Sequence, residues 1–190
     1  MKHHKIEQNT DEWFALRCGK ITASQFKDCF AKETTQAFQN LIYSKRAEIH
    51  TGEVEESYQN EWMLRGHELE PEARELYELQ NLVSVEPGGF WELNEYVGAS
   101  PDGLVGNDGL LEIKCPKAST MERYFEENRL PTVYKWQVYG QMLCTGRKWV
   151  DFVAYHPKYD LFVFRVNRDE ELIKELNEQL QKVTNKILKK

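Results

Sequence analysis

Residues 98–116, GASPDGLVGNDGLLEIKCP, place three charged side chains within two short apolar segments. Asp102 stands just before GLV, and Glu112 and Lys114 alternate with apolar residues in LLEIKC. A charge drawn toward a protein core is costly unless a partner compensates it. The partners that we expect for these side chains are a metal ion and a phosphate.

The two apolar segments are predicted to form a hairpin. Asn107-Asp108-Gly109 is a turn signal between them. In a strand, residues two apart share a face, so Glu112 and Lys114 should project together. The turn can bring Asp102 opposite Glu112, which gathers two carboxylates and an ammonium group in a small volume.

This gathering of charge favours a divalent cation. Two carboxylates about 4 Å apart repel each other by roughly 4 kcal/mol at an effective dielectric near 20, and one lysine offsets only part of that. Hard oxygen ligands suit Mg²⁺ or Mn²⁺, and the carbonyl of Ile113 could add another oxygen. Lys114 could orient a water molecule or neutralise charge on a phosphate. The alternative is a surface Glu/Lys ladder with an aspartate in a turn.

The composition fits one domain spanning residues 1–190. Hydrophobic residues make up 41% of the chain, enough for a core. The net charge of −6 does not exclude nucleic acid, since phosphate binding depends on local potential. The four cysteines lack a CxxC pattern, so we expect reduced thiols. Neither a transmembrane segment nor a signal peptide is recognisable, which predicts a cytosolic protein.

The remaining patterns predict an α+β fold, an α/β sandwich with a central mixed sheet flanked by helices. Apolar or alternating segments from Leu82 to Val105, and again at 149–156 and 160–167, favour strands. Helices are expected in NTDEWFALRCG, capped by Asn9 or Thr10, and in ASQFKDCF, capped by Thr22 or Ser24. Further helical patterns cover residues 36–50, 58–80 with an interruption at Pro71, 119–128, 132–146 and 169–189.

SPDGLV followed by LLEIKCP resembles the PD…ExK nuclease signature, and specifically the lambda-exonuclease or YqaJ-type viral recombinase family. Three further segments resemble motifs of that family in the same order: LRCGKITAS at 16–24, RGHELEPEARELYE at 65–78 and KWQVYGQMLCTG at 135–146. The resemblance implies a restriction-endonuclease-like core. One departure is Tyr139, where many relatives place a second glutamine.

The resemblance also implies site residues. Asp102 and Glu112 would bind metal together with Glu70 and the carbonyl of Ile113, and Lys114 would be the catalytic lysine. A pocket for the 5′-phosphate of a DNA end would contain Arg17 and Ser24, and Gln137 would lie at the edge of the site. Taken alone, Glu70, Arg17, Ser24 and Gln137 can each equally be an ordinary surface, helix or capping residue.

By this resemblance the chain would be a Mg²⁺-dependent exonuclease, with Mn²⁺ possible. It would degrade linear double-stranded DNA from the 5′ end to 5′-mononucleotides and leave a 3′ single strand for recombination. Relatives form a ring-shaped trimer and work with a single-strand annealing protein, which implies a homo-oligomer and such a partner. An origin in a phage or prophage, and the cytoplasm of a bacterial host, are likewise implied.

Two alternatives remain. The same core occurs in structure-specific and sequence-specific endonucleases, which would cut closed circular DNA. A non-catalytic module that binds DNA ends would bind metal without turnover. The presence of all three of Asp102, Glu112 and Lys114 argues against the second alternative.

Overall fold

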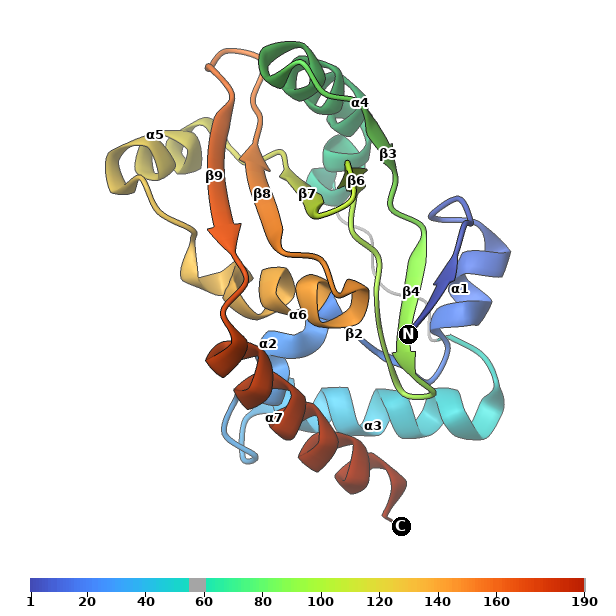
Figure 1. Cartoon of the computed structure of the whole chain (residues 1–190). Coiled ribbons are helices and arrows are strands. Elements are labelled where there is room, and N and C mark those ends of the chain that lie inside the picture. Colours follow the sequence, from blue (N-terminus) through green and yellow to red (C-terminus); the bar gives the residue numbers. More distant parts are fainter. Residues whose placement is uncertain (55–60, 190) are drawn as a thin grey trace.

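Helices surround two separate sheets in the computed structural model, which describes residues 1–54 and 61–189 (Figure 1). The helices are α1 (Asp11–Arg17), α2 (Phe26–Cys29), α3 (Gln36–Thr51), α4 (Glu61–Asn81), α5 (Ala118–Glu127), α6 (Lys135–Thr145) and α7 (Glu170–Leu188), with short 3₁₀ turns η1 (Ala23–Gln25) and η2 (Thr132–Tyr134). The strands are β1 (Lys2–His4), β2 (Ile21–Thr22), β3 (Val85–Pro87), β4 (Phe90–Asn94), β5 (Val97–Ala99), β6 (Gly103–Val105), β7 (Gly109–Lys114), β8 (Trp149–Ala154) and β9 (Phe162–Asn167).

The predicted α+β class is confirmed, but the strands form two sheets rather than a single central one. The larger sheet has the order β3-β6-β7-β8-β9 and is mixed, because β7 and β8 run parallel while its other pairs are antiparallel. The smaller sheet has the order β1-β4-β5-β2. The segment between β5 and β6 therefore passes from one sheet to the other.

This change of sheet occurs at Ser100–Asp102, within the run from Leu82 to Val105 in which strands are expected. Pro101 lacks a backbone N–H and cannot donate to a strand ladder, so pairing stops there. The chain resumes pairing at Gly103, where an added Cβ would lie 2.2 Å from Val85 Cγ1. Asp102 is thereby held at the junction of the two sheets.

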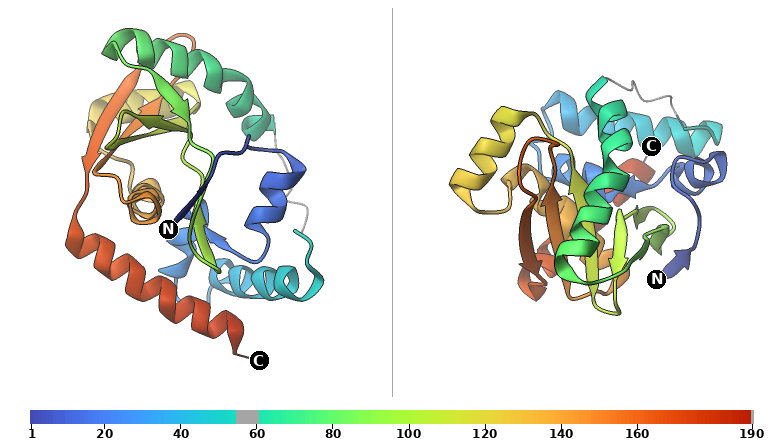
Figure 2. Two further views of the ribbon diagram at one scale, coloured as in Figure 1. Left: turned by 45° about the vertical axis from the view of Figure 1, so that its right-hand side comes forward. Right: turned by 90° about the horizontal axis from the view of Figure 1, so that it is seen from above.

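Two helices cover opposite faces of the larger sheet (Figure 2). On one face, Ala73 and Tyr77 of α4 pack against Leu111 and Ile113 of β7. On the other face, Val138 and Met142 of α6 pack with Leu110 of β7 and Val150 of β8, among others. Because side chains alternate along β7, Glu112 and Lys114 lie on the face that α6 covers.

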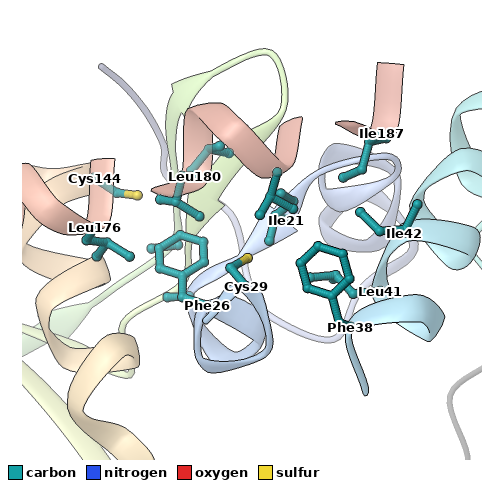
Figure 3. Packing of buried hydrophobic residues seen from close by; sticks show 14 residues of the cluster. Ile21, Phe26, Cys29, Phe38, Leu41, Ile42, Cys144, Leu176, Leu180 and Ile187 are labelled. Carbon is teal, nitrogen blue, oxygen red and sulfur yellow. The ribbon is translucent and has the colours of Figure 1, made fainter. Parts of the chain in front are cut away.

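A separate apolar cluster joins the N-terminal region to α7. Figure 3 shows Phe26 and Cys29 beside Leu176 and Leu180 of α7, and Phe38 and Leu41 of α3 on the side of the cluster nearer Ile187. The apolar residues of α7 recur at helical spacing, so one stripe of this helix is buried while the rest is exposed. The cluster fixes η1 and α2 against α6, where an added Cβ at Gly140 would lie 2.2 Å from the Phe26 ring.

The helices begin at capping residues as expected. The predicted interruption of a helix at Pro71 is wrong. Thr10, rather than Asn9, caps α1 by accepting a hydrogen bond from Trp13 N, and Thr22 rather than Ser24 precedes η1. Helix α4 continues through Pro71 without interruption. Residues 58–60 of the predicted helix lie outside the described residues. Within residues 1–54 and 61–189, no helix is long and apolar enough to span a membrane.

A buried polar network ties α4 to the larger sheet. Asp151 of β8 is 1% exposed and accepts hydrogen bonds from Tyr77 Oη at 2.7 Å and from Arg165 Nε and Nη2 at 2.7 and 2.8 Å. Asp151→Asn replaces one acceptor oxygen by a donor and removes the charge. Because a hydrogen bond to a charged group contributes about 1.5–3 kcal/mol, we expect the free energy of unfolding to fall by about 2 kcal/mol.

The measurement is chemical or thermal unfolding of Asp151→Asn, with a decrease in Tm of about 4–8 °C. Asp108→Asn is the matched control, since Asp108 pairs with Lys148 at 2.9 Å and both side chains are largely exposed. That exposed pair should contribute less than about 1 kcal/mol. Equal effects of the two substitutions would contradict the role given to the buried network.

Candidate active site

The hairpin brings Asp102 and Glu112 face to face, as the sequence predicts. Gly103 pairs with Leu111 across the two strands, which places Asp102 opposite Glu112. Asp102 is held through both its backbone and its side chain. Its N–H donates to Leu111 O at 3.1 Å, and its Oδ2 accepts from Ile113 N at 2.6 Å. The carboxylate is therefore oriented by the backbone of the strand that carries Glu112 and Lys114.

Glu112 is a buried carboxylate surrounded by donors. Its side chain is 1% exposed, so a solvated surface ladder is the wrong interpretation of this strand. Its Oε1 accepts hydrogen bonds from Lys114 Nζ and Gln137 Nε2, and its Oε2 accepts one from Gln141 Nε2. Lys114 is 28% exposed and also approaches the Tyr134 ring, with Nζ 5.5 Å from the ring centroid.

The electrostatics of the three groups are strongly coupled. Burial raises the pKa of Asp102 from 3.8 to about 6, and the charge of Glu70 adds to this rise. Burial and the charge of Asp102 raise the pKa of Glu112 from 4.5 to about 7. Burial lowers the pKa of Lys114, but the two carboxylates outweigh burial and raise it above its ordinary value. Lys114 is therefore a cation at neutral pH, beside carboxylates that need more positive charge.

These residues fit a hard divalent cation. Repulsion between the buried carboxylates is the feature that such an ion relieves, and carboxylate oxygens are the ligands that Mg²⁺ and Mn²⁺ prefer. Glu70 projects from α4 close enough to influence Asp102 and accepts a hydrogen bond from Arg74 Nη2 at 2.9 Å. Among the described residues, no three His, Cys, Asp or Glu side chains already surround a single metal position.

A second glutamine of the site was missed from the sequence. Gln141 is fully buried, and it stands one helical turn after Gln137, so both amides reach Glu112 from the same face of α6. Its Oε1 is buried and, among the described residues, has no hydrogen-bond partner. Tyr139, which stands where many relatives place a glutamine, packs instead against the apolar clusters. The i, i+4 spacing of the two glutamines was the signal available in the sequence.

Arg17 and Ser24, the predicted phosphate-binding residues, are brought together by Thr22. Arg17 Nη2 lies 3.5 Å from Thr22 Oγ1, which in turn lies 3.4 Å from Ser24 Oγ. The guanidinium group of Arg17 stacks on Trp13, with 3.8 Å between Cζ and the ring centroid. Two hydroxyl groups and a guanidinium group form a cluster that suits a phosphate.

This cluster is attached directly to the strand that leads into the carboxylate site. Trp13 Nε1 donates to Ser100 Oγ at 2.9 Å, and Gln8 Nε2 donates to Pro101 O at 2.9 Å. Thr22 pairs with Gly98 through the parallel β2–β5 ladder. The Arg17 cluster and Asp102 are thus connected through a segment of only a few residues.

Comparisons with known proteins agree with this arrangement. Residues 12–148 match the model of the YqaJ-like viral recombinase domain. The crystal structure of an alkaline exonuclease (LHK-Exo) from Laribacter hongkongensis is similar with a TM-score of 0.87 and 36% sequence identity, over 94% of this chain and 92% of that one. LHK-Exo in complex with dAMP matches with the same TM-score and 37% identity, over the same shares of the two chains. Among curated proteins, none matches the chain.

A more distant likeness supports the fold alone. The structure of a phage-related exonuclease from Haemophilus somnus 129PT has a TM-score of 0.65 and 16% identity, over 88% of this chain and 93% of that one. The predicted restriction-endonuclease-like core is confirmed by the similarity to LHK-Exo. The family match and the close likeness together show that this chain belongs to the YqaJ-like viral recombinase family.

Proposed function

We propose that this protein is a metal-dependent exonuclease that degrades linear double-stranded DNA from the 5′ end and leaves a 3′ single strand. The observation that carries the proposal is the short connection between the Asp102–Glu112–Lys114 site and the Arg17–Thr22–Ser24 cluster. A site that cuts near a bound terminal phosphate acts at ends. The similar LHK-Exo is an alkaline exonuclease, and its complex with dAMP matches the expected class of product.

In this proposal Asp102 and Glu112 would hold Mg²⁺, or Mn²⁺ in its place, together with Glu70 and the carbonyl of Ile113. The ion would activate water and stabilise the leaving oxygen. Gln137 and Gln141 keep the Glu112 carboxylate in one orientation by donating to its two oxygens. Lys114, held as a cation by the carboxylates, orients the attacking water or offsets charge that develops on the phosphate.

The terminal 5′-phosphate would bind to Arg17, Thr22 and Ser24. Burial lowers the pKa of Arg17 to about 10, so the group still carries its charge at neutral pH. A guanidinium group binds two phosphate oxygens at once, and hydroxyl groups add neutral donors. The remaining family-based expectations, a homo-oligomer such as a trimer, a single-strand annealing partner and a location in the cytoplasm of a bacterial host, are parts of the same proposal.

The test uses linear duplex DNA with the label at a 3′ end, with and without a 5′-phosphate, and a closed circle. We expect Mg²⁺-dependent loss of one strand from phosphorylated ends and an intact circle. Arg17→Ala should lower kcat/KM on phosphorylated ends by about 10- to 100-fold, the effect of losing a hydrogen bond to a charged group. Cleavage of 5′-hydroxyl ends should change much less.

The other outcomes distinguish the alternatives. Nicking of the circle would assign the site to an endonuclease. Binding of DNA ends without cleavage in either Mg²⁺ or Mn²⁺ would support a non-catalytic module. Measurement of the size of the protein in solution would test the proposed trimer, and stimulation by a matching single-strand annealing protein would test the proposed partner, both separately from the chemistry.

A further inference from the structure

Helix α3 contains a buried ion pair that faces the N-terminal region. Lys45 and Glu48 are 5% and 4% exposed, and Lys45 Nζ donates to both carboxylate oxygens of Glu48 at 2.8 Å. A buried pair of this kind is weak evidence of stabilisation, because its desolvation offsets most of its attraction. The role of the Lys45–Glu48 pair is therefore better judged from where it lies and from the third group that it contacts.

The third partner is the turn that follows Arg17. Glu48 Oε2 also accepts a hydrogen bond from Gly19 N at 2.8 Å, and the Cys18 thiol lies 3.6 Å from Glu48 O. Gly19 has a φ of +72°, and a Cβ there would lie 2.9 Å from Ile49 Cγ1, so this turn requires glycine and sits closely on α3. The carboxylate of Glu48 thus determines where the turn lies.

Arg17 remains without a carboxylate partner although it is largely buried. Across residues 1–54 and 61–189 it takes part in no ion pair; its guanidinium group stacks on the Trp13 ring and donates to Thr22 Oγ1. Burial lowers its pKa, and the charge of Glu48 acts against this effect. Both oxygens of Glu48 are already engaged by Lys45, and one also by Gly19, so Glu48 supports the charge of Arg17 without binding it.

We propose that Lys45 and Glu48 are positioning residues for the phosphate pocket: Glu48 fixes the turn at Gly19, and Lys45 keeps Glu48 from pairing with Arg17. The inference rests on the proposed function, because Arg17 stays unpaired in order to bind the terminal 5′-phosphate of the DNA. Removal of the ammonium group frees a buried carboxylate beside Arg17. The charge of Glu48 already acts on Arg17, so Arg17 is the cation with which the freed carboxylate would pair, and that pair withdraws Arg17 from the substrate.

The experiment measures phosphate preference, the ratio of kcat/KM on 5′-phosphorylated to 5′-hydroxyl linear duplex DNA. Lys45→Met should lower this preference by about tenfold, comparable to the loss of one charged hydrogen bond, mainly through a higher KM on phosphorylated ends. The double substitution Lys45→Met with Glu48→Gln removes both charges and keeps an acceptor for Gly19 N. It should restore most of the preference, and in an Arg17→Ala background Lys45→Met should have no further effect.

Asp151→Asn is the matched control, because it disrupts a different ion pair, between β8 and β9 of the larger sheet, and should reduce stability without changing the preference. If Lys45→Met does not fold, Lys45→Gln retains a donor to Glu48 and should show a smaller loss in the same direction.

A drop in Tm with an unchanged preference would overturn the inference and leave the pair a structural element. Failure of the double substitution to restore the preference would overturn it as well. If the wild-type protein cleaves both kinds of end equally, Arg17 and its neighbours do not form a phosphate pocket. That result is distinguishable from failure of the proposed nuclease function, because cleavage would persist without any preference.

Discussion

Lys114→Ala is expected to reduce cleavage of linear duplex DNA by about 10³-fold, in the range found for removal of a transition-state stabiliser or a proton-transfer group. Lys114 Nζ donates to Glu112 and lies within the field of Asp102, and both carboxylates keep it charged. In the proposed reaction it supplies positive charge next to the phosphate that is attacked. Alanine removes this charge and leaves the carboxylates in place.

The fold should survive this substitution. Glu112 would keep hydrogen bonds from Gln137 and Gln141, and its raised pKa lets it take up a proton when the ammonium group is absent. Lys114 is also partly exposed, so its removal leaves no closed cavity. We therefore expect an unchanged circular dichroism spectrum and nearly unchanged DNA binding beside the loss of turnover.

Single-turnover cleavage at saturating DNA and Mg²⁺ is the measurement. Lys148→Ala is the matched control, since Lys148 pairs with the exposed Asp108 and its side chain is 70% exposed. It should cleave at the wild-type rate. A Lys114→Ala protein that retains more than about a tenth of the wild-type rate would contradict the role assigned to this lysine.

Strand periodicity was sufficient to predict that the three charged side chains of the candidate site lie together. The alternation in LLEIKC put Glu112 and Lys114 on one face, and the turn at 107–109 put Asp102 opposite Glu112, as the structure confirms. Such local arguments succeed because a hairpin depends on residues close in sequence. The resemblance to the family supplied Arg17 and Ser24, which local pattern alone would have assigned to the surface and to a helix cap.

Features that depend on distant parts of the chain were not predicted. The change of sheet at Pro101 depends on which strands pair, and pairing between β2 and β5 joins residues far apart in sequence. Glu48 looked like one of many charges on an amphipathic helix, because only its tertiary contact with Gly19 distinguishes it. The i, i+4 spacing of Gln137 and Gln141 showed that the two amides share a helix face, but only the tertiary contact with Glu112 shows that this face points into the candidate site.

Asp102→Asn is expected to remove activity and at the same time to stabilise the metal-free protein. A divalent cation contributes several kcal/mol to phosphoryl transfer, which corresponds to a loss of about 10³-fold when a carboxylate ligand is removed. Asparagine keeps an oxygen that can accept the hydrogen bond from Ile113 N. The charge is lost, while the geometry of the hairpin is retained.

The gain in stability follows from the raised pKa of Asp102. In the unfolded chain this carboxyl titrates near 3.8, and in the folded protein, chiefly through burial, near pH 6. Between these values the folded state holds a proton that the unfolded state has lost, so stability decreases as the pH rises through this window. The decrease is complete above pH 6 and amounts to about 3 kcal/mol for a shift of this size.

Asparagine does not titrate, so the substituted protein escapes this loss. In EDTA at pH 7.5 we expect Asp102→Asn to unfold at a Tm several degrees above that of the wild type, and at pH 4 the difference should vanish. Addition of Mg²⁺ should then raise the Tm of the wild type and have little effect on the variant, because a ligand that binds only the folded state stabilises it. A variant that is less stable than the wild type at pH 7.5 without metal would show that burial of the Asp102 carboxylate does not destabilise the folded protein as inferred. A variant that still gains stability from Mg²⁺ would place the principal metal ligand elsewhere.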